Sequence, residues 1–168
     1  MSEIIDNIAR TCGRTRGGIF SLVAIPCDGA TFTYTEGLVT AVTQTKLAKT
    51  IALDINSGKA SSTQEGDRAN MSSIYKESVE FTVKTDELEI EKTLESLTGG
   101  LHIIIVKYAN GKNKIYGAEN GMLINKVADS GTEGTDLNGN IMTGTSESST
   151  IPPHISNTDL DAIIAFTL

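Results

Sequence analysis

The sequence is poor in aromatic residues, in cysteine and in basic charge. Its 168 residues include no Trp, four Tyr, four Phe and two Cys, and 14 Lys and Arg stand against 21 Asp and Glu. Two cysteines, Cys12 and Cys27, are too few for a disulfide framework, and in a reducing compartment we expect both to be thiols. The net charge of −7 argues against tight sequence-independent binding of nucleic acid, because that affinity comes mainly from Lys and Arg displacing counterions from phosphates.

Long apolar runs are also missing. No stretch approaches the roughly 18 apolar residues that a membrane-spanning helix needs, and the N-terminus lacks the basic start and apolar core of a secretion signal. We therefore expect a protein that does not cross a membrane and is not exported. In that setting the glycosylation pattern Asn70-Met71-Ser72 is accidental.

β-Branched and turn-forming residues take the place of the aromatic ones. The chain contains 19 Ile, 21 Thr and 16 Gly, which suit a pleated sheet and its turns. Its length is that of one domain. We predict a mainly β (α+β) fold, a β-sandwich or barrel with one flanking α-helix, made of an N-terminal arm at 1–18 and a single β-rich domain at 19–168. Within the arm, Ile4, Ile5 and Ile8 fit either a short helix or a segment that orders against a neighbour.

Eight to ten strands are expected. A buried strand should run from Ile19 to Pro26, and a turn at Glu36-Gly37 should join the next two strands. Asn110-Gly111 and Asn120-Gly121 are two-residue hairpin signals. The other expected strands are 51–55, 79–83, 101–108, 112–119, 122–128, 140–146 and the C-terminal 162–168.

The segment 57–73 has almost nothing to bury. Gly, Ser, Asn and charged residues fill it, and loops longer than about 12–15 residues are usually functional or mobile. It is predicted to be a long loop that acts in assembly or as a lid.

One helix is expected at 86–98. Thr85 or Asp86 can cap its N-terminus, and Gly99-Gly100 can supply a left-handed stop. The predicted apolar stripe consists of Ile90, Leu94 and Leu97, and the predicted exposed acidic face of Glu87, Glu91 and Glu95.

Candidate catalytic groups are few. A nucleophile-and-base pair needs a histidine, and only His102 and His154 are present. His102 begins a buried strand, where a structural role is favoured, and His154 lies in a predicted solvated loop. No nucleophile elbow, phosphate-binding loop or zinc-protease motif occurs. We predict that the protein is not an enzyme, an interpretation to be revised if either histidine lies in a pocket beside Cys12, Cys27 or a carboxylate.

Metal and cofactor sites have little support. No Cys or His pair has zinc-ligand spacing. Asp136, Asn138, Asn140 and Glu147 occupy positions 1, 3, 5 and 12 of a calcium loop, but Ile141 stands where the loop requires Gly. Ordinary β-turn composition explains the pattern better, and no cofactor or metal is predicted.

The only basic cluster is Arg10, Arg14 and Arg16. It can meet phosphate, meet an acidic face on another copy, or lie in solvent. Between the two binding alternatives the acidic face is favoured, because patches of opposite sign on one chain suit self-association.

The order of features along the chain resembles that of a known protein family. Cys12 is followed by Gly17-Gly18-Ile19 and a strand-rich stretch to Ile55, and a polar segment with Thr63-Gln64-Glu65 precedes the strand KESVEFTVK. The helix, LHIIIVKYANGK, the IYGAENGMLI hairpin and TGTSES complete the order. This order resembles small virion structural proteins of tailed phages, of the tail-tube and neck-ring type found in phages of gut Bacteroidota.

The resemblance implies a β-domain whose copies join edge to edge into a six- or twelve-fold ring. Neighbouring tail or neck proteins would be its partners, and double-stranded DNA would pass through the lumen without specific binding. The protein would be made in the host cytoplasm and reside in the virion. The segment 151–168 runs past the expected end, which leaves tube, neck-ring and terminator roles open. A capsid decoration or a host- or glycan-binding domain is the alternative, although the absence of Trp weakens the glycan version.

Overall fold

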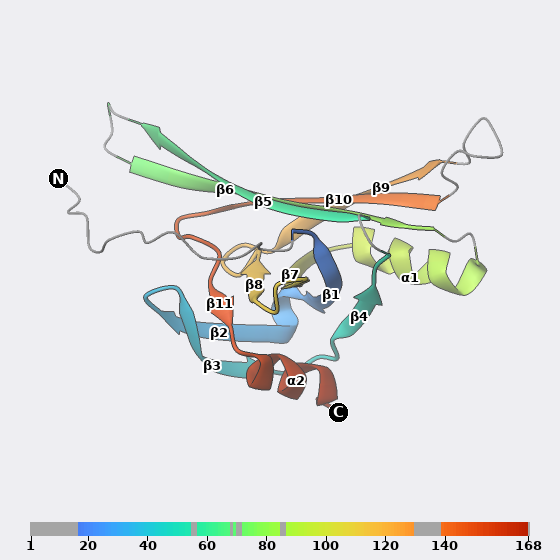
Figure 1. Cartoon of the computed structure of the whole chain (residues 1–168), viewed down its shortest axis with the longest axis horizontal. Coiled ribbons are helices and arrows are strands. Elements are labelled where there is room, and N and C mark those ends of the chain that lie inside the picture. The colour runs from blue at the N-terminus through green and yellow to red at the C-terminus, as the bar shows by residue number, and fades with distance from the viewer. Residues whose placement is uncertain are drawn as a thin grey trace.

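The computed structural model describes residues 17–54, 57–67, 69, 72–84, 87–129 and 139–167. Most of the predicted arm at 1–18 lies outside these residues. Eleven strands, two α-helices and one 3-10 turn make up the described chain (Figure 1). The strands are β1 Ile19–Pro26, β2 Ala30–Thr35, β3 Leu38–Gln44, β4 Lys49–Ala52, β5 Gly58–Asp67, β6 Ser72–Val83, β7 Leu101–Tyr108, β8 Asn113–Tyr116, β9 Met122–Asp129, β10 Gly139–Ser148 and β11 His154–Ile155; the helices are α1 Leu88–Thr98 and α2 Asn157–Ala165, and the 3-10 turn is η1 Cys27–Gly29. Neither helix is long and apolar enough to span a membrane.

All described strands join one sheet. Its order is β2-β3-β11-β8-β7-β9-β10-β6-β5, and β1 pairs with β7 and with β4. The pairings are antiparallel except for β3 with β11. The predicted mainly β, α+β fold is therefore confirmed. The sheet is open, with β2 and β5 at the two ends of the order, so it is not a closed barrel.

β1 and β7 form the centre of the molecule, buried on both faces. Leu22 and Ala24 of β1 pack into one apolar core, and Val23 and Ile25 pack into a second. Figure 1 shows β5, β6, β9 and β10 on one side of this pair and β2, β3 and α2 on the other. Burial on both faces explains why the sequence of β7 is apolar without alternation.

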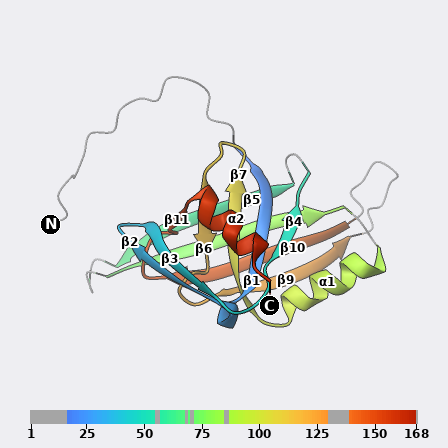
Figure 2. The same ribbon diagram turned by 90° about the horizontal axis from the view of Figure 1, so that it is seen from below.

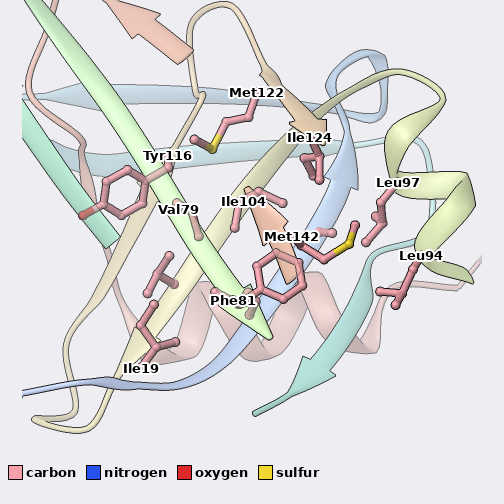
Figure 3. Packing of buried hydrophobic residues seen from close by; sticks show 13 residues of the cluster. Ile19, Val79, Phe81, Leu94, Leu97, Ile104, Tyr116, Met122, Ile124 and Met142 are labelled. Atoms are coloured by element: carbon pink, nitrogen blue, oxygen red, sulfur yellow. The ribbon is translucent and has the colours of Figure 1, made fainter. Parts of the chain in front are cut away.

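Helix α1 closes the first core. Leu94 and Leu97 are buried against it and Ile90 packs at its edge, which confirms the predicted apolar stripe. Figure 3 shows Phe81 of β6 and Met142 of β10 between the sheet and these leucines. The predicted left-handed stop is wrong, because Gly99 has φ −79° and ends the helix in the right-handed region. Thr85 and Asp86 lie outside the described residues, and Glu87 stands at the N-cap without a side-chain cap bond.

The predicted loop at 57–73 is wrong. The segment contains all of β5, Gly58–Asp67, and the start of β6 at Ser72. The two strands form a hairpin that pairs without a register shift from Gly58↔Phe81 to Asp67↔Ser72. From Ser61 to Asp67 every side chain is exposed. Because neither face is buried there, no alternation of apolar and polar residues marks the strand.

The predicted C-terminal strand is also wrong, and the described residues form two α-helices where the sequence predicts one. Asn157–Ala165 is α2, whose N-cap Ser156 accepts the backbone N–H of Asp159 at 3.1 Å. Leu160 and Ile163, three residues apart, are buried in the second core. Short apolar runs fit either element, and here the cap and this spacing give a helix.

The glycine turns differ in what they join. Glu36-Gly37 connects β2 to β3 with positive φ at both residues, as predicted. The predicted hairpin at Asn110-Gly111 also forms, since β7 and β8 pair, but its connection is the four residues 109–112 and not a two-residue turn. Gly121 also has positive φ, but β8 and β9 do not pair with each other. They occupy successive parts of one edge of β7, because β1 pairs along the other edge.

Candidate assembly surface

The β5–β6 hairpin projects beyond the rest of the sheet (Figure 1). Among the described strands β5 pairs with β6 alone, so its other edge is open for its ten residues. An edge strand of this length is a template for pairing with another chain.

The hydrogen bonds at the hairpin base show which backbone groups face the open edge. The N–H of Thr82 donates to the carbonyl of Ser57 at 2.8 Å. In an antiparallel ladder alternate residues bond to the partner strand, and the residues between them turn their N–H and C=O groups away. The groups turned to the open edge are those of Gly58, Ala60, Ser62, Gln64 and Gly66.

Side chains on the outer face of the hairpin bear charges of both signs. Lys76 of β6 forms a 2.8 Å ion pair with Glu65 of β5, and the hydrogen bond that Lys76 donates to Glu65 raises the pKa of Lys76 above its ordinary value. Both groups are more than half exposed, so the pair contributes little to stability. Besides its backbone groups, β5 therefore carries uncharged side chains from Ala60 to Gln64 and three charged ones, Lys59, Glu65 and Asp67.

Glu77 lies midway along the hairpin, opposite Ser62, on the inner face of β6. Its residue is only 3% exposed, and its Oε2 accepts the N–H of Gly117 at 2.6 Å. Burial raises the pKa of Glu77 above its ordinary 4.5; the Gly117 N–H opposes this shift, and the charge of Glu119 adds to it. Among the described residues Glu77 takes part in no ion pair. Every second residue of β6 back from Phe81 faces the core, so Val79 and then Glu77 lie on the buried face. This alternation is the sequence signal that could have identified Glu77 as a buried carboxyl group.

Two tyrosines continue this polar cluster. The hydroxyls of Tyr108 and Tyr116 lie 2.5 Å apart in a hydrogen bond. Burial is the main reason that the pKa of each phenol is above its ordinary value, and the charge of Glu77 adds to the shift at Tyr116. These hydroxyls are therefore neutral hydrogen-bonding groups.

Glu119 ties the β8–β9 turn to the end of β10. Its carboxylate accepts the backbone N–H of Ser149 at 2.6 Å and the hydroxyls of Ser149 and Ser148. These bonds, the backbone one first, lower the pKa of Glu119. The clamp fixes the path by which the chain leaves β10 for β11.

A pocket of about 560 Å³ brings Cys27 and His102 together at the end of β1. Pro26 of β1 pairs with His102 of β7, so Cys27, the next residue after Pro26, lies close to β7. His102 is 9% exposed and its Nδ1 lies 3.2 Å from the carbonyl oxygen of Gly100. In the described part of the chain no hydrogen bond joins the Cys27 thiol to this ring, so the pocket holds both groups without the contact that an activated thiol needs.

Asp28 also lines this pocket, but it is engaged elsewhere. Its carboxylate forms an ion pair with Lys46, and that hydrogen bond is the main reason that the pKa of Asp28 is lowered. The condition for reconsidering an enzyme, a histidine with a cysteine or carboxylate in one pocket, is thus met by His102, Cys27 and Asp28. Within the described residues, neither the thiol of Cys27 nor the carboxylate of Asp28 forms a hydrogen bond with the ring of His102.

His154 lies in β11 and not in a solvated loop. Its backbone N–H donates to the carbonyl of Gly37 at 2.7 Å, and its side chain is partly buried. Burial, and then the charges of Lys114 and Lys112, lower the pKa of His154.

The remaining predicted sites are not brought together. Asn140 and Glu147 both lie in β10, seven residues apart, which is about 23 Å along a strand. They cannot share a calcium ion, and Asp136 and Asn138 lie outside the described residues. Within those residues no cluster of three or more His, Cys, Asp or Glu side chains could hold a metal.

The acidic face of α1 is only partly as predicted. Glu87 and Glu95 are exposed, but Glu91 is partly buried, and Glu95 lies 4.0 Å from Lys126. Cys12, the basic cluster Arg10, Arg14 and Arg16, and Asn70-Met71 lie outside the described residues. Cys27 is a thiol.

Comparison with known proteins identifies no relative: no family model, no curated protein and no solved structure matches this chain.

Proposed function

We propose that this protein is a structural subunit that assembles with copies of itself into a ring around a DNA channel, in a phage tail tube or head-to-tail connector. The observation that carries the proposal is the open edge of β5 on a projecting hairpin. Neighbouring tail or neck proteins are the proposed further partners, and the virion is the proposed location. The resemblance in the order of sequence features supports the phage setting.

The edge suits a contact between copies because its bonding groups are backbone ones. Five residues turn N–H and C=O groups outward along β5, and an added strand would pair with them as β6 does on the other side. Ser61 to Gln64, in the middle of β5, have exposed uncharged side chains, and the charged Lys59, Glu65 and Asp67 lie nearer its two ends. β2, at the other end of the strand order, offers a second edge. A subunit with edges at both ends can continue the sheet into neighbours on both sides.

Catalysis has no part in this role. A ring subunit needs complementary edges and a wall that does not retain DNA, and the net charge of −7 on each copy meets the second need.

Native mass spectrometry and negative-stain imaging of the purified full chain test the proposal. Ring-shaped or tubular particles are expected at high protein concentration. A monodisperse monomer that never assembles would contradict it and favour a decoration or host-binding domain.

A pair of variants at Gln64 tests the edge itself. Gln64→Pro removes an N–H that faces away from β6, so the hairpin should persist while edge pairing is lost. Gln64→Val also removes the amide side chain but keeps the N–H, so it should assemble like the natural protein. Equal assembly of both variants would show that the β5 edge is not the contact.

A further inference from the structure

Phe20 stands at an irregularity in β1. The register with β7 shifts between Ile19, opposite Tyr108, and Ser21, opposite Lys107, so Phe20 is left out of the pairing. Its side chain is 64% exposed, in a chain with four Phe and no Trp. Bulges re-aim side chains, and aromatic residues are enriched where proteins contact one another. The bulge therefore presents an aromatic anchor to solvent near the start of β1.

A positive charge accompanies the ring. The ammonium of Lys107 lies 6.0 Å from the centroid of the Phe20 ring, within the range of a cation–π contact. This end of the β1–β7 pair thus carries an apolar side chain and a cation together.

The other end of the same strand pair holds a complementary hollow. The 560 Å³ pocket has Pro26, Cys27 and Leu101 as its apolar wall, and Leu101 is 49% exposed at its mouth. Phe20 and Pro26 are six residues apart on β1, about 20 Å along a strand. Figure 2 shows β1 and β7 running between the β7–β8 turn and the end near α1.

The charge at the pocket is complementary as well. Ser96 and Gly99, at the C-terminal end of α1, form part of its wall, and the last turn of α1 contains no basic residue. The carbonyl groups at a helix C-terminus favour a nearby cation. The pocket is thus suited to an apolar ring that arrives with a positive charge.

We propose that Phe20 of one copy inserts into the Cys27–Leu101 pocket of a second copy and brings Lys107 to the C-terminal end of that copy's α1. Because the two halves of the contact lie at opposite ends of one strand pair, the contact repeats head to tail and stacks copies. This inference rests on the proposed self-assembly, to which it adds a stacking contact separate from edge pairing through β5.

Cross-linking tests the contact. Replacing Phe20 by the photoreactive aromatic amino acid benzoyl-phenylalanine keeps an aromatic ring at the anchor and places a cross-linking group where it would meet Cys27 of a neighbour. Irradiation should then produce a ladder of dimers, trimers and higher species, with position 20 joined to Cys27 in peptide mass spectra. The matched control is the same replacement at Leu38, since Leu38 is 53% exposed on β3.

Removal of the anchor gives a second measurement. Phe20→Ser should raise the protein concentration needed for half-maximal stacking about 30-fold, the usual effect of losing an interface hot spot, and Lys107→Glu should raise it in the same direction. A thermal melt close to that of the natural protein shows that each variant is folded.

The outcomes separate the two proposals. If the natural chain forms rings but position 20 links to Cys27 no more than position 38 does, the stacking contact is wrong and the ring proposal stands. If the natural chain stays monomeric and no ladder forms, both are wrong. If position 20 cross-links specifically to Cys27 and Gln64→Pro assembles like the natural protein, the stacking contact is supported and pairing through the β5 edge is wrong.

Discussion

At the residue scale, Glu77 is a buried carboxyl group midway along the β5–β6 hairpin. Burial raises its pKa, so the folded protein binds a proton there at pH values where the unfolded chain has lost it. The free energy of unfolding therefore falls as pH rises from about 4.5 through the folded pKa, and it levels off above that value.

Glu77→Gln removes this pH dependence, because Gln cannot ionise while its carbonyl can accept the Gly117 N–H. We expect the melting temperature of the variant, relative to that of the natural protein, to increase as pH rises across this window. Melts between pH 4.5 and 9 measure it. Glu80→Gln, an exposed neighbour in β6, is the control. A difference that is constant with pH would show that Glu77 does not titrate differently in the folded state.

Gly117 supplies the N–H that Glu77 accepts, and its own position tolerates no side chain. Its φ is +71°, and a Cβ there would lie 2.6 Å from Cγ of Met122 and 2.9 Å from backbone atoms. Gly117→Ala should destabilise the protein by about 2–4 kcal/mol, the sum of left-handed strain and overpacking. Gly111→Ala at φ +83°, with nothing within 4 Å, isolates the strain alone and should cost about 1–2 kcal/mol. Equal losses of stability for the two variants, measured by urea unfolding, would show that contacts of the new methyl group with Met122 add nothing to the strain at Gly117.

At the element scale, helix α2 depends on its cap. Ser156 accepts the N–H of Asp159, and its hydroxyl donates to the Asp159 carboxylate at 2.6 Å. Ser156→Ala should lower stability by about 1 kcal/mol. Thr158→Ala, an exposed change in the first turn, is the control. Chemical denaturation measures both, and equal effects would show that the cap does not hold the helix.

The elements that the sequence predicts well are those with one dry face or two. β7 is apolar and buried from Ile103 to Val106, and α1 repeats Ile90, Leu94 and Leu97 on one side, so burial itself marks them. β5 leaves no such mark, because its outer residues are exposed on both faces and hydrogen bonds to β6 alone make it a strand. α2 was predictable from Ser156 and Asp159, but its short apolar run fits a strand equally well.

The candidate sites depend on pairings between distant residues. Cys27 and His102 line one pocket because Pro26 of β1 pairs with His102 of β7, and no local sequence pattern specifies this register. The open edge of β5 follows from the order of the whole sheet. Of these features, only the burial of Glu77 could have been predicted from the sequence, because it continues the alternation of buried residues that includes Val79.

At the scale of the whole molecule, net charge affects both the proposed contacts between copies and the proposed passage of DNA. Each copy carries −7, so copies repel at long range, while the proposed contacts act at short range through backbone groups and one aromatic anchor. Salt screens the first effect, because the Debye length falls from about 30 Å at 0.01 M to about 10 Å at 0.1 M. Assembly should therefore increase between 10 and about 150 mM NaCl, as measured by light scattering. Assembly that weakens with salt would show that ion pairs dominate the contacts.

The same charge should keep an assembled ring from retaining DNA. Affinity for a duplex grows with the number of phosphates that Lys and Arg neutralise, and each copy has 14 basic groups against 21 acidic ones. Multiplied around a ring, this balance gives a wall that repels the backbone and lets a duplex slide. Fluorescence anisotropy with a labelled duplex should find no saturable binding by assembled particles at about 150 mM salt. Saturable binding that declines steeply with salt would instead place a basic surface in the lumen, and the acidic balance of the chain would then have to lie on the outside of the ring.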